Sequence, residues 1–234
     1  VAALDESAAS ARFVVVEGDP GIGKTRLVDE LRRRGDARGA IAVWGRSDES
    51  GAAPALYPWL PPLRALAERE GSVAPALDEL LAGNAPVTAG PAAGLRFARF
   101  EAVADLLERA GAHAPVVVLL DDLQWADDAS LELLAFLAGR LDRGVLVVAT
   151  MRQLEVGRND AVTDALAAIA RRAGSRRLQL RGLSGAVRCR FGRGHCNRLR
   201  GGGLLQRLVD ILVQCPIDIV ELVSPVRTRL PTYL

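Results

Sequence analysis

A glycine-rich segment near the N-terminus has the residue types and the spacing that bind phosphate groups. Residues 18–25 read Gly-Asp-Pro-Gly-Ile-Gly-Lys-Thr, which matches the pattern G-x-x-x-x-G-K-[ST] at every fixed position. Glycines let consecutive backbone N–H groups turn toward phosphate oxygens, and a helix that starts at the end of the loop adds its positive dipole. The predicted nucleotide-binding residues are Gly18, Asp19, Pro20, Gly21, Ile22, Gly23, Lys24, Thr25 and Arg26.

The last two fixed positions of this loop predict which ligands it takes. Lys24 is the only lysine in a chain of 234 residues, and every other Lys or Arg position is arginine. A GC-rich genome would explain the excess of arginine, so the one remaining lysine suggests that arginine cannot replace it there. In a loop of this type the lysine contacts the β- and γ-phosphates of ATP, and the Thr25 hydroxyl ligates Mg²⁺. We therefore expect ATP and Mg²⁺ at this site.

A pair of carboxylates follows the most apolar run of the chain. Val116–Leu120 contains only Val and Leu, and Asp121 and Asp122 come directly after it. Because hard cations prefer oxygen ligands, we expect Asp121 to hold the magnesium ion and Asp122 to position or deprotonate an attacking water. The alternative is an aspartate pair that only caps the end of a strand. The P-loop argues against that alternative, since ligand sites of open α/β sheets lie at the carboxyl ends of the strands.

An arginine follows a third apolar run. Val145–Ala149 reads as a buried strand, and Thr150, Met151 and Arg152 come directly after it. The permanently charged guanidinium of Arg152 would lie at the same edge of the sheet, where it could sense a γ-phosphate. The alternative is a loop arginine that points into solvent.

The apolar pattern predicts the elements that position these three motifs. Strands are expected where short runs are rich in β-branched residues, and helices where apolar residues recur at spacings of three and four. The predicted strands are 13–16, 40–44, 116–120, 145–149 and 177–180. The predicted helices are 25–34, 63–70, 76–82, 95–110, 129–141 and 162–172. Strands that are apolar on both faces and alternate with helices predict an α/β fold: a P-loop NTPase with a parallel β-sheet flanked by helices in three layers.

Two segments between these elements are expected to be loops. Ser47–Pro62 and Gly83–Gly94 are rich in Pro, Gly and Ala and have no apolar period. Asp128, which precedes the helix at 129–141, is the predicted N-cap of that helix.

The composition is that of an ordinary globular protein. Half of the residues are hydrophobic and a quarter are charged. The sequence contains no run of 18 or more apolar residues, so we predict no membrane span. Val1–Ala11 lacks the basic-then-apolar pattern of a secretory signal, so we expect a cytoplasmic protein. The three cysteines, Cys189, Cys196 and Cys215, lack paired C-x-x-C spacing, and we interpret them as free thiols instead of a zinc site.

The C-terminal part of the chain differs from the rest in charge and in pattern. Residues 1–170 carry 17 Lys and Arg against 25 Asp and Glu, whereas residues 171–234 carry 13 against 3. After Leu183 the regular apolar period also ends. We therefore predict two parts, an ATPase core at 1–183 and a basic, poorly ordered or aberrant tail at 184–234, which we expect to contribute nothing to nucleotide binding.

Three interpretations of this tail remain open. Its positive charge would attract phosphates, as in a nucleic-acid-binding arm. It could be a divergent form of the helical lid that covers related sites. It could also be the out-of-frame translation of a GC-rich gene, which would give Arg, Gly, Cys and Pro without periodicity. The sudden loss of pattern and the confinement of every cysteine to this stretch favour the third interpretation.

Taken together, the motifs resemble the ATPase domain of STAND-type NTPases, and most closely the AAA-type domains of large LuxR-family transcriptional regulators. The most distinctive match is Leu119–Leu137, with its D-D-x-x-W-A-D core, and the resemblance extends over about residues 13–183. The other matching segments are Gly18–Thr25, Trp44–Arg46, Tyr57–Trp59, Arg96–Phe97 and the Thr150-x-Arg152 pair.

The resemblance implies roles for individual residues. Asp121 would be the magnesium-associated acid, Asp122 the water-side acid and Arg152 the sensor arginine, while Trp125 would be a packing residue. The chain departs from the family at both ends: no G-R-E-type segment precedes the P-loop, and no lid, winged helix or helix-turn-helix is recognisable after Leu183. Contact with DNA is therefore expected only through domains outside this sequence.

The function predicted from these features is a signal-transduction ATPase whose bound nucleotide sets a conformational switch, with slow ATP hydrolysis and a role in transcription regulation. Two alternatives remain open. A small-molecule kinase shares the P-loop but needs an acceptor pocket, and a nucleotide-binding module would bind ATP without significant turnover. Phosphate release with and without a phosphoryl acceptor would distinguish the three.

Overall fold

Strands and helices alternate along most of the chain. The computed structural model describes residues 11–37, 39–82, 93–152, 160–172 and 175–180, and the strand backbone at 187–191 and 198–199. The strands are β1 (Arg12–Glu17), β2 (Ile41–Arg46), β3 (Val116–Asp121), β4 (Val145–Met151), β5 (Arg176–Gln179), β6 (Val187–Phe191) and β7 (Arg198–Leu199). The α-helices are α1 (Lys24–Asp36), α2 (Leu60–Glu70), α3 (Pro75–Leu81), α4 (Ala93–His113), α5 (Asp128–Arg140) and α6 (Asp160–Arg171). Two 3₁₀ turns, η3 (Tyr57–Trp59) and η4 (Leu123–Trp125), lie between them.

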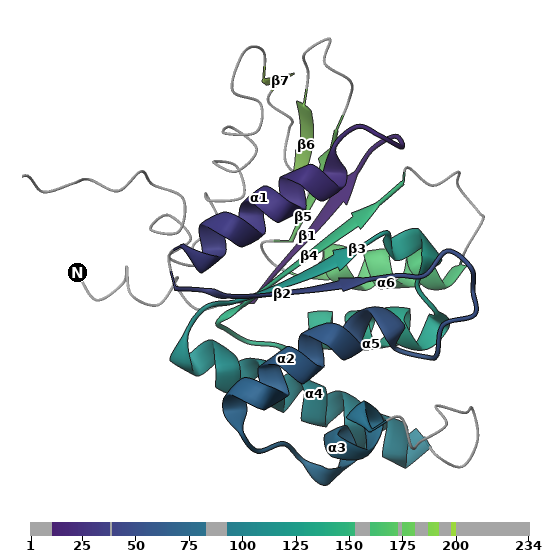
Figure 1. Cartoon of the computed structure of the whole chain (residues 1–234). Coiled ribbons are helices and arrows are strands. Elements are labelled where there is room, and N and C mark those ends of the chain that lie inside the picture. The colour runs from purple at the N-terminus through teal and green to yellow at the C-terminus, as the bar shows by residue number, and fades with distance from the viewer. Residues whose placement is uncertain are drawn as a thin grey trace, which may run out of the picture.

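The strands form one sheet in the order β2-β3-β4-β1-β5-β6-β7. β1 to β5 are parallel, and β6 and β7 extend the β5 edge in antiparallel fashion. Parallel neighbours need crossover connections, and the helices supply them. β1 lies beside β4, and β4 lies beside β3. Because these strands are parallel, the segments that follow them meet at the carboxyl ends of the strands (Figure 1).

Each central strand contributes side chains to both faces of the sheet. Phe13 and Val15 of β1 point into the larger hydrophobic core, which lies under α2 to α6. Val14 and Val16 point into a second core, beneath α1. Figure 1 shows α1 on one side of the sheet and the other helices on the opposite side. Because both faces are covered, uninterrupted apolar strands are stable here, and the predicted three-layer α/β fold is confirmed.

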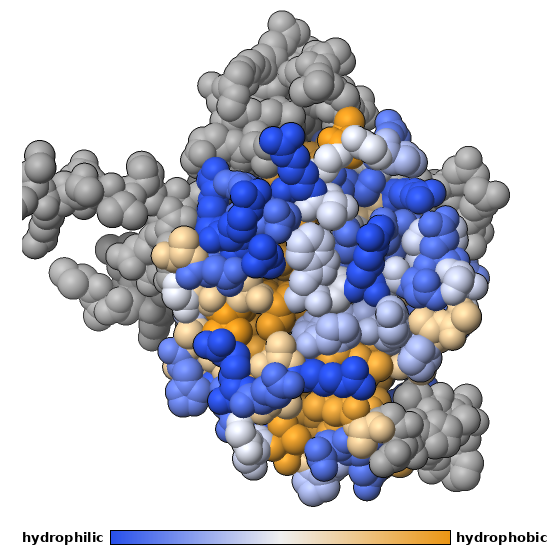
Figure 2. Space-filling view, viewed as in Figure 1, coloured by the Kyte–Doolittle hydropathy of each residue, from blue (hydrophilic) through white to orange (hydrophobic). Residues whose placement is uncertain are grey.

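The outer surface of α1 is charged. Arg32 pairs with Asp29 and Asp36, and Arg33 pairs with Asp29 and Glu30, at spacings of three and four residues. Such pairs lie on one side of a helix and stabilise it modestly. In the view of Figure 2, blue hydrophilic residues cover the region of α1, whereas orange hydrophobic residues gather over the helices in the lower half.

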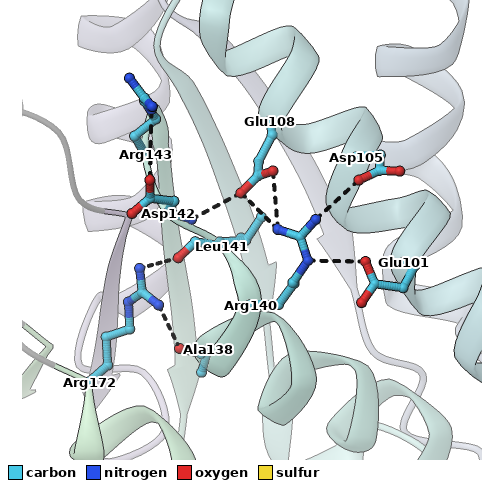
Figure 3. Close-up of polar contacts among 9 residues, drawn as sticks. All are labelled: Glu101, Asp105, Glu108, Ala138, Arg140, Leu141, Asp142, Arg143 and Arg172. Atoms are coloured by element: carbon cyan, nitrogen blue, oxygen red, sulfur yellow. Dashed lines mark hydrogen bonds and ion pairs between the residues drawn. The ribbon is translucent and has the colours of Figure 1, made fainter.

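An arginine network joins α4 to α5 (Figure 3). The guanidinium of Arg140 lies 3.0 Å from Glu101, 3.3 Å from Asp105 and 3.2 Å from Glu108. Hydrogen bonds to Glu101 and Glu108 raise the pKa of Arg140. Nearby, Arg172 donates to the carbonyl oxygens at the end of α5, and its burial lowers its pKa. These contacts hold α4 and α5 together near the amino ends of the strands, opposite the nucleotide motifs.

Some predicted boundaries were wrong. The segment Ser47–Pro62, predicted as a loop, contains η3 and the start of α2, because Pro61 and Pro62 occupy first-turn positions where a proline needs no N–H partner. Asp127, and not Asp128, is the N-cap of α5. No strand was predicted at 187–191 or 198–199, where β6 and β7 occur. Most of the predicted loop at 83–94 lies outside the described residues, as do residues 204–223, where the sequence regains some helical character.

Among the described residues, no helix is both long enough and apolar enough to cross a membrane.

Candidate nucleotide site

The predicted phosphate-binding loop connects β1 to α1. β1 ends at Glu17 and α1 begins at Lys24, as the motif requires. Gly21 and Gly23 have φ angles of 74° and 101°, a region that side-chain-bearing residues rarely adopt. Added Cβ atoms at these two glycines would meet nothing within 4 Å, so backbone conformation, rather than space, requires glycine there.

The start of α1 is arranged to bind an anion. Its N-cap, Gly23, provides no side-chain hydrogen bond, and the first turn of the helix has no acidic residue. The N–H groups of a first helical turn have no partner within the helix, and the helix dipole is positive at that end. The predicted binding residues Thr25 and Arg26 lie exposed in this turn. The loop and the helix end therefore fit the phosphate groups of a nucleotide.

Lys24 is buried beneath the loop. Its ammonium donates to the carbonyl oxygens of Gly18 at 2.9 Å and of Asp19 at 3.1 Å. Burial lowers the pKa of Lys24; the charge of Arg152 lowers it further, while nearby carboxylates, with Asp122 first among them, raise it. The Lys24 ammonium is thus held by neutral carbonyl oxygens, close enough to Asp122 and Arg152, the two predicted catalytic residues, for their charges to affect its pKa.

The structure brings Thr25 and Asp121 together. The Thr25 hydroxyl donates to Asp121 Oδ2 at 3.1 Å, although the two residues are 96 positions apart in the chain. Asp121 ends β3 and is only 1 % exposed, and the Thr150 hydroxyl of β4 donates to its other oxygen. A hydroxyl and a carboxylate at hydrogen-bond distance fit the oxygen ligands that Mg²⁺ prefers.

In the part of the chain that the structure describes, no group of three or more His, Cys, Asp or Glu side chains could hold a metal ion. Mg²⁺ is usually bound by one or two protein ligands together with phosphate oxygens and water, and Thr25 and Asp121 fit the protein part of such a site.

Asp122 lies just beyond β3 in an unusual conformation. Its φ and ψ angles of 60° and 48° are left-handed, which is uncommon for a residue other than glycine. Its side chain accepts hydrogen bonds from Arg46 at 3.0 Å and from Gln124 at 3.1 Å, and its backbone N–H donates to Thr150. Strained residues that the surroundings hold in place are concentrated at functional sites.

Arg152 lies at the same edge, directly after β4. Its guanidinium carbon is 5.6 Å from the centre of the Trp125 ring, a cation–π distance. Its backbone N–H donates to Gln124 at 2.9 Å. Trp125, expected to be a packing residue, is 38 % exposed and is the surface on which Arg152 rests.

Sequence reasoning missed the side chains that hold Asp122. Arg46 was named only as part of the Trp44–Arg46 segment that matches the family, and no role was predicted for Gln124. The signal that could have found Arg46 is its position at the end of a predicted strand, since such ends meet at the ligand edge of a parallel sheet. Gln124 has no comparable signal, because its contacts depend on the left-handed turn at Asp122.

The last acid of the D-D-x-x-W-A-D segment has a structural role. The carboxylate of Asp127 accepts from the backbone N–H of Ser130 at 3.0 Å and from that of Leu56 at 3.1 Å, and the Ser130 hydroxyl bonds to it at 2.6 Å. One side chain therefore caps α5 and fixes the loop before η3. Leu56 is buried with a φ of 63°, so this bond holds a strained backbone.

Replacing Asp127 with alanine is expected to lower the free energy of unfolding by about 2 kcal/mol, because it removes a helix cap and leaves a partly buried N–H unpaired. Asp128→Ala is the matched control, since Asp128 is exposed in the first turn of α5 and contributes only about 0.3–1 kcal/mol through the helix dipole. Urea denaturation of the two variants would test this. Equal losses would contradict the assignment of Asp127 as the cap.

A cavity of about 500 Å³ opens beside Asp122 at the β2 edge. The residues lining it include Arg46, Glu49, Tyr57 and Trp125. Two strands, β3 and β4, separate β2 from β1, so this cavity is distinct from the phosphate-binding loop but shares Asp122 with the candidate site.

Among the comparisons with known proteins, the match to a family model agrees with a nucleotide site. The model of the family described as AAA ATPase domain matches residues 1–148. A chain in the structure of Drosophila ORC bound to DNA is 14 % identical, with a TM-score of 0.40, over 76 % of this chain and 83 % of that one. The structure of C. elegans PCH-2 is 16 % identical, with a TM-score of 0.33, over 94 % of this chain and 43 % of that one. No curated protein matches the sequence.

Proposed function

The chain belongs to the AAA ATPase domain family, whose model matches more than half of it, and we propose that it binds ATP with Mg²⁺. In this proposal the chain hydrolyses ATP slowly and acts as a nucleotide-dependent switch. The observation that carries the proposal is the hydrogen bond between Thr25 and Asp121, with Lys24 buried in the loop beside them. Three residues of the types that bind a nucleotide and its metal ion thereby lie close together, two in the first turn of α1 and one at the end of β3.

Each residue has a defined task in this proposal. Residues 18–26 bind the phosphates, with Lys24 at the β- and γ-phosphates, and Thr25 and Asp121 hold the metal ion. Mg²⁺, when bound there, neutralises charge on the phosphate oxygens. Asp122 orients the attacking water and accepts its proton, and Arg152 leaves Trp125 to contact the γ-phosphate. Movement of Arg152 between these positions would distinguish the ATP state from the ADP state.

We expect Asp122→Asn to slow single-turnover ATP hydrolysis by about 100-fold and to change ATP affinity by less than about threefold. An asparagine keeps the shape of the side chain but cannot accept the proton of the water. Asp121→Asn is the matched variant, and it should instead weaken Mg²⁺-dependent ATP binding. Phosphate release and equilibrium binding would be measured on the full chain. Wild-type hydrolysis by Asp122→Asn would remove its role and favour a module that binds nucleotide without turnover.

A small-molecule kinase is a second candidate because the cavity beside Asp122 could hold a phosphoryl acceptor. In that case Asp122 would take the proton of an acceptor hydroxyl instead of that of water. The same phosphate assay distinguishes the two: a kinase releases little inorganic phosphate and forms a phosphorylated product only with acceptor present.

The wider context of the domain is also part of the proposal. The LuxR-like D-D-x-x-W-A-D segment supports a role in transcription regulation, in a cytoplasmic protein whose DNA contacts lie in other domains. We place the boundary of the ATPase core at residue 183 and propose that residues 184–234 form a basic segment, of which β6 and β7 extend the sheet of the core. The alternative to DNA contact through other domains alone is that this basic segment is a nucleic-acid-binding arm, and salt-sensitive DNA binding by the full chain would support that alternative.

A further inference from the structure

Gln124 occupies the space between the water-side acid and the arginine that follows β4. Its amide nitrogen donates to Asp122 Oδ1 at 3.1 Å, and its amide oxygen accepts from the backbone N–H of Arg152 at 2.9 Å. We propose that Gln124 is a positioning residue through which the segment at Arg152 sets the orientation of the Asp122 carboxylate. The inference rests on the proposed role of Asp122 in hydrolysis.

The chemistry of the two contacts fixes the amide in one orientation. A carboxylate only accepts hydrogen bonds and a backbone N–H only donates, so the side chain between them needs one donor and one acceptor at opposite ends. Turning the Gln124 amide over would place its oxygen against the carboxylate and its NH₂ group against the N–H. Both contacts would then be repulsive.

Gln124 holds Asp122 more firmly than Arg46 does. The Arg46 side chain is 69 % exposed, and an ion pair in solvent contributes little because water screens it and a long side chain must be ordered. Gln124 is half-buried and follows Asp122 in the short η4 turn, so it loses less freedom on making its contacts. The left-handed backbone at Asp122 also needs neighbours that hold it in place.

The same turn contacts residue 152 twice. Gln124 holds the backbone N–H of Arg152, and the adjacent Trp125 lies under its guanidinium. If the backbone at Arg152 moves when its guanidinium turns toward a γ-phosphate, the Trp125 contact breaks and the N–H that anchors the Gln124 amide is displaced. The carboxylate oxygen bonded to that amide would move with it. Nucleotide state and the geometry of the water-side acid are coupled in this way without direct contact between Arg152 and Asp122.

The test compares Gln124→Met, which keeps the length of the side chain without its polar atoms, with Gln124→His, whose neutral ring again has one donor and one acceptor. In Gln124→Met the single-turnover rate should fall about 10- to 100-fold with ATP affinity within about threefold, because a misplaced catalytic group costs rate rather than binding. Hydrogen exchange of the Arg152 amide, measured without nucleotide, should become at least about tenfold faster. Gln124→His should recover most of both effects.

Asp122→Asn, measured alongside, keeps the outcomes apart. If Asp122→Asn is slow but Gln124→Met hydrolyses at the wild-type rate, the inference about Gln124 falls and the proposed function stands. If Gln124→Met loses affinity and thermal stability together with rate, or if Gln124→His recovers nothing, the residue is merely structural and the inference is overturned. If Asp122→Asn is as fast as the wild type, or if the full chain does not hydrolyse ATP, both proposals fail.

Discussion

Replacing Lys24 with alanine is expected to weaken ATP binding by at least about 100-fold while the chain stays folded. Lys24 is the only lysine in the chain, and removing its ammonium takes away the cation that the loop itself provides for the β- and γ-phosphates. The fold should survive, because burial lowers the pKa of Lys24, which means that its charge is held at a cost in the nucleotide-free state. Isothermal titration with Mg·ATP and thermal unfolding of the same samples would measure both quantities.

Two further variants make this test specific. Lys24→Arg should also fail to bind tightly, because a planar guanidinium does not fit a site that holds a compact ammonium against two carbonyl oxygens. Arg33→Ala removes a cation from the exposed surface of the same helix, where it pairs with Asp29 and Glu30, and should leave ATP affinity unchanged. Equal affinity in Lys24→Ala and the wild-type protein would refute the assignment of the loop.

The elements that carry the nucleotide motifs could be predicted because their signals are local. β1, β3 and β4 are short, buried strands that contain the apolar runs 13–16, 116–120 and 145–149, and helices cover both faces of the sheet that they form. The P-loop has fixed residues at fixed spacing between a strand and a helix. For the same reason the sequence placed Asp121 and Thr25 at one edge, and the structure joins them by a hydrogen bond.

The wrong predictions of secondary structure fell mainly where the same local pattern is compatible with two structures. Asp127 and Asp128 are adjacent acids before one helix, and only the contact with Leu56, far away in the sequence, explains why the first of them is the cap. The Pro61-Pro62 pair resembles a loop, yet proline is also favoured in the first turn of a helix, which is how α2 uses it. β6 reads Val-Arg-Cys-Arg-Phe, an alternation that is typical of a strand, but it is only five residues long and lies in an otherwise irregular stretch, so the prediction missed it. It pairs with β5.

The environment of Asp122 could not be predicted, because it depends on contacts between segments. Arg46 lies 76 residues before Asp122, and Gln124 reaches the acid only because the intervening backbone turns left-handed. A sequence pattern shows which residues follow each strand. It does not show which of them hydrogen-bond to one another once the strands are side by side.

Gly45 shows how closely two of these segments approach. It lies in β2 next to Arg46, and a Cβ atom added there would be 1.6 Å from the carbonyl oxygen of Pro58 and 2.7 Å from its carbonyl carbon. Both are backbone atoms, which cannot rotate away as a side chain would. The Trp44–Arg46 and Tyr57–Trp59 segments, separate in the sequence, are therefore in direct contact, and only glycine permits it.

Gly45→Ala is consequently expected to lower the free energy of unfolding by more than about 4 kcal/mol, a large share of the total for a domain of this size. The added methyl group must push β2 away from η3, which would also displace Arg46 from Asp122. Gly139→Ala in α5 is the matched control, because nothing lies within 4 Å of a Cβ atom there and the change should stabilise the helix by about 0.5–1 kcal/mol. Urea denaturation of both variants decides the matter: a Gly45→Ala protein within 1 kcal/mol of the wild type would mean that β2 and η3 are not packed as closely as the structure has them.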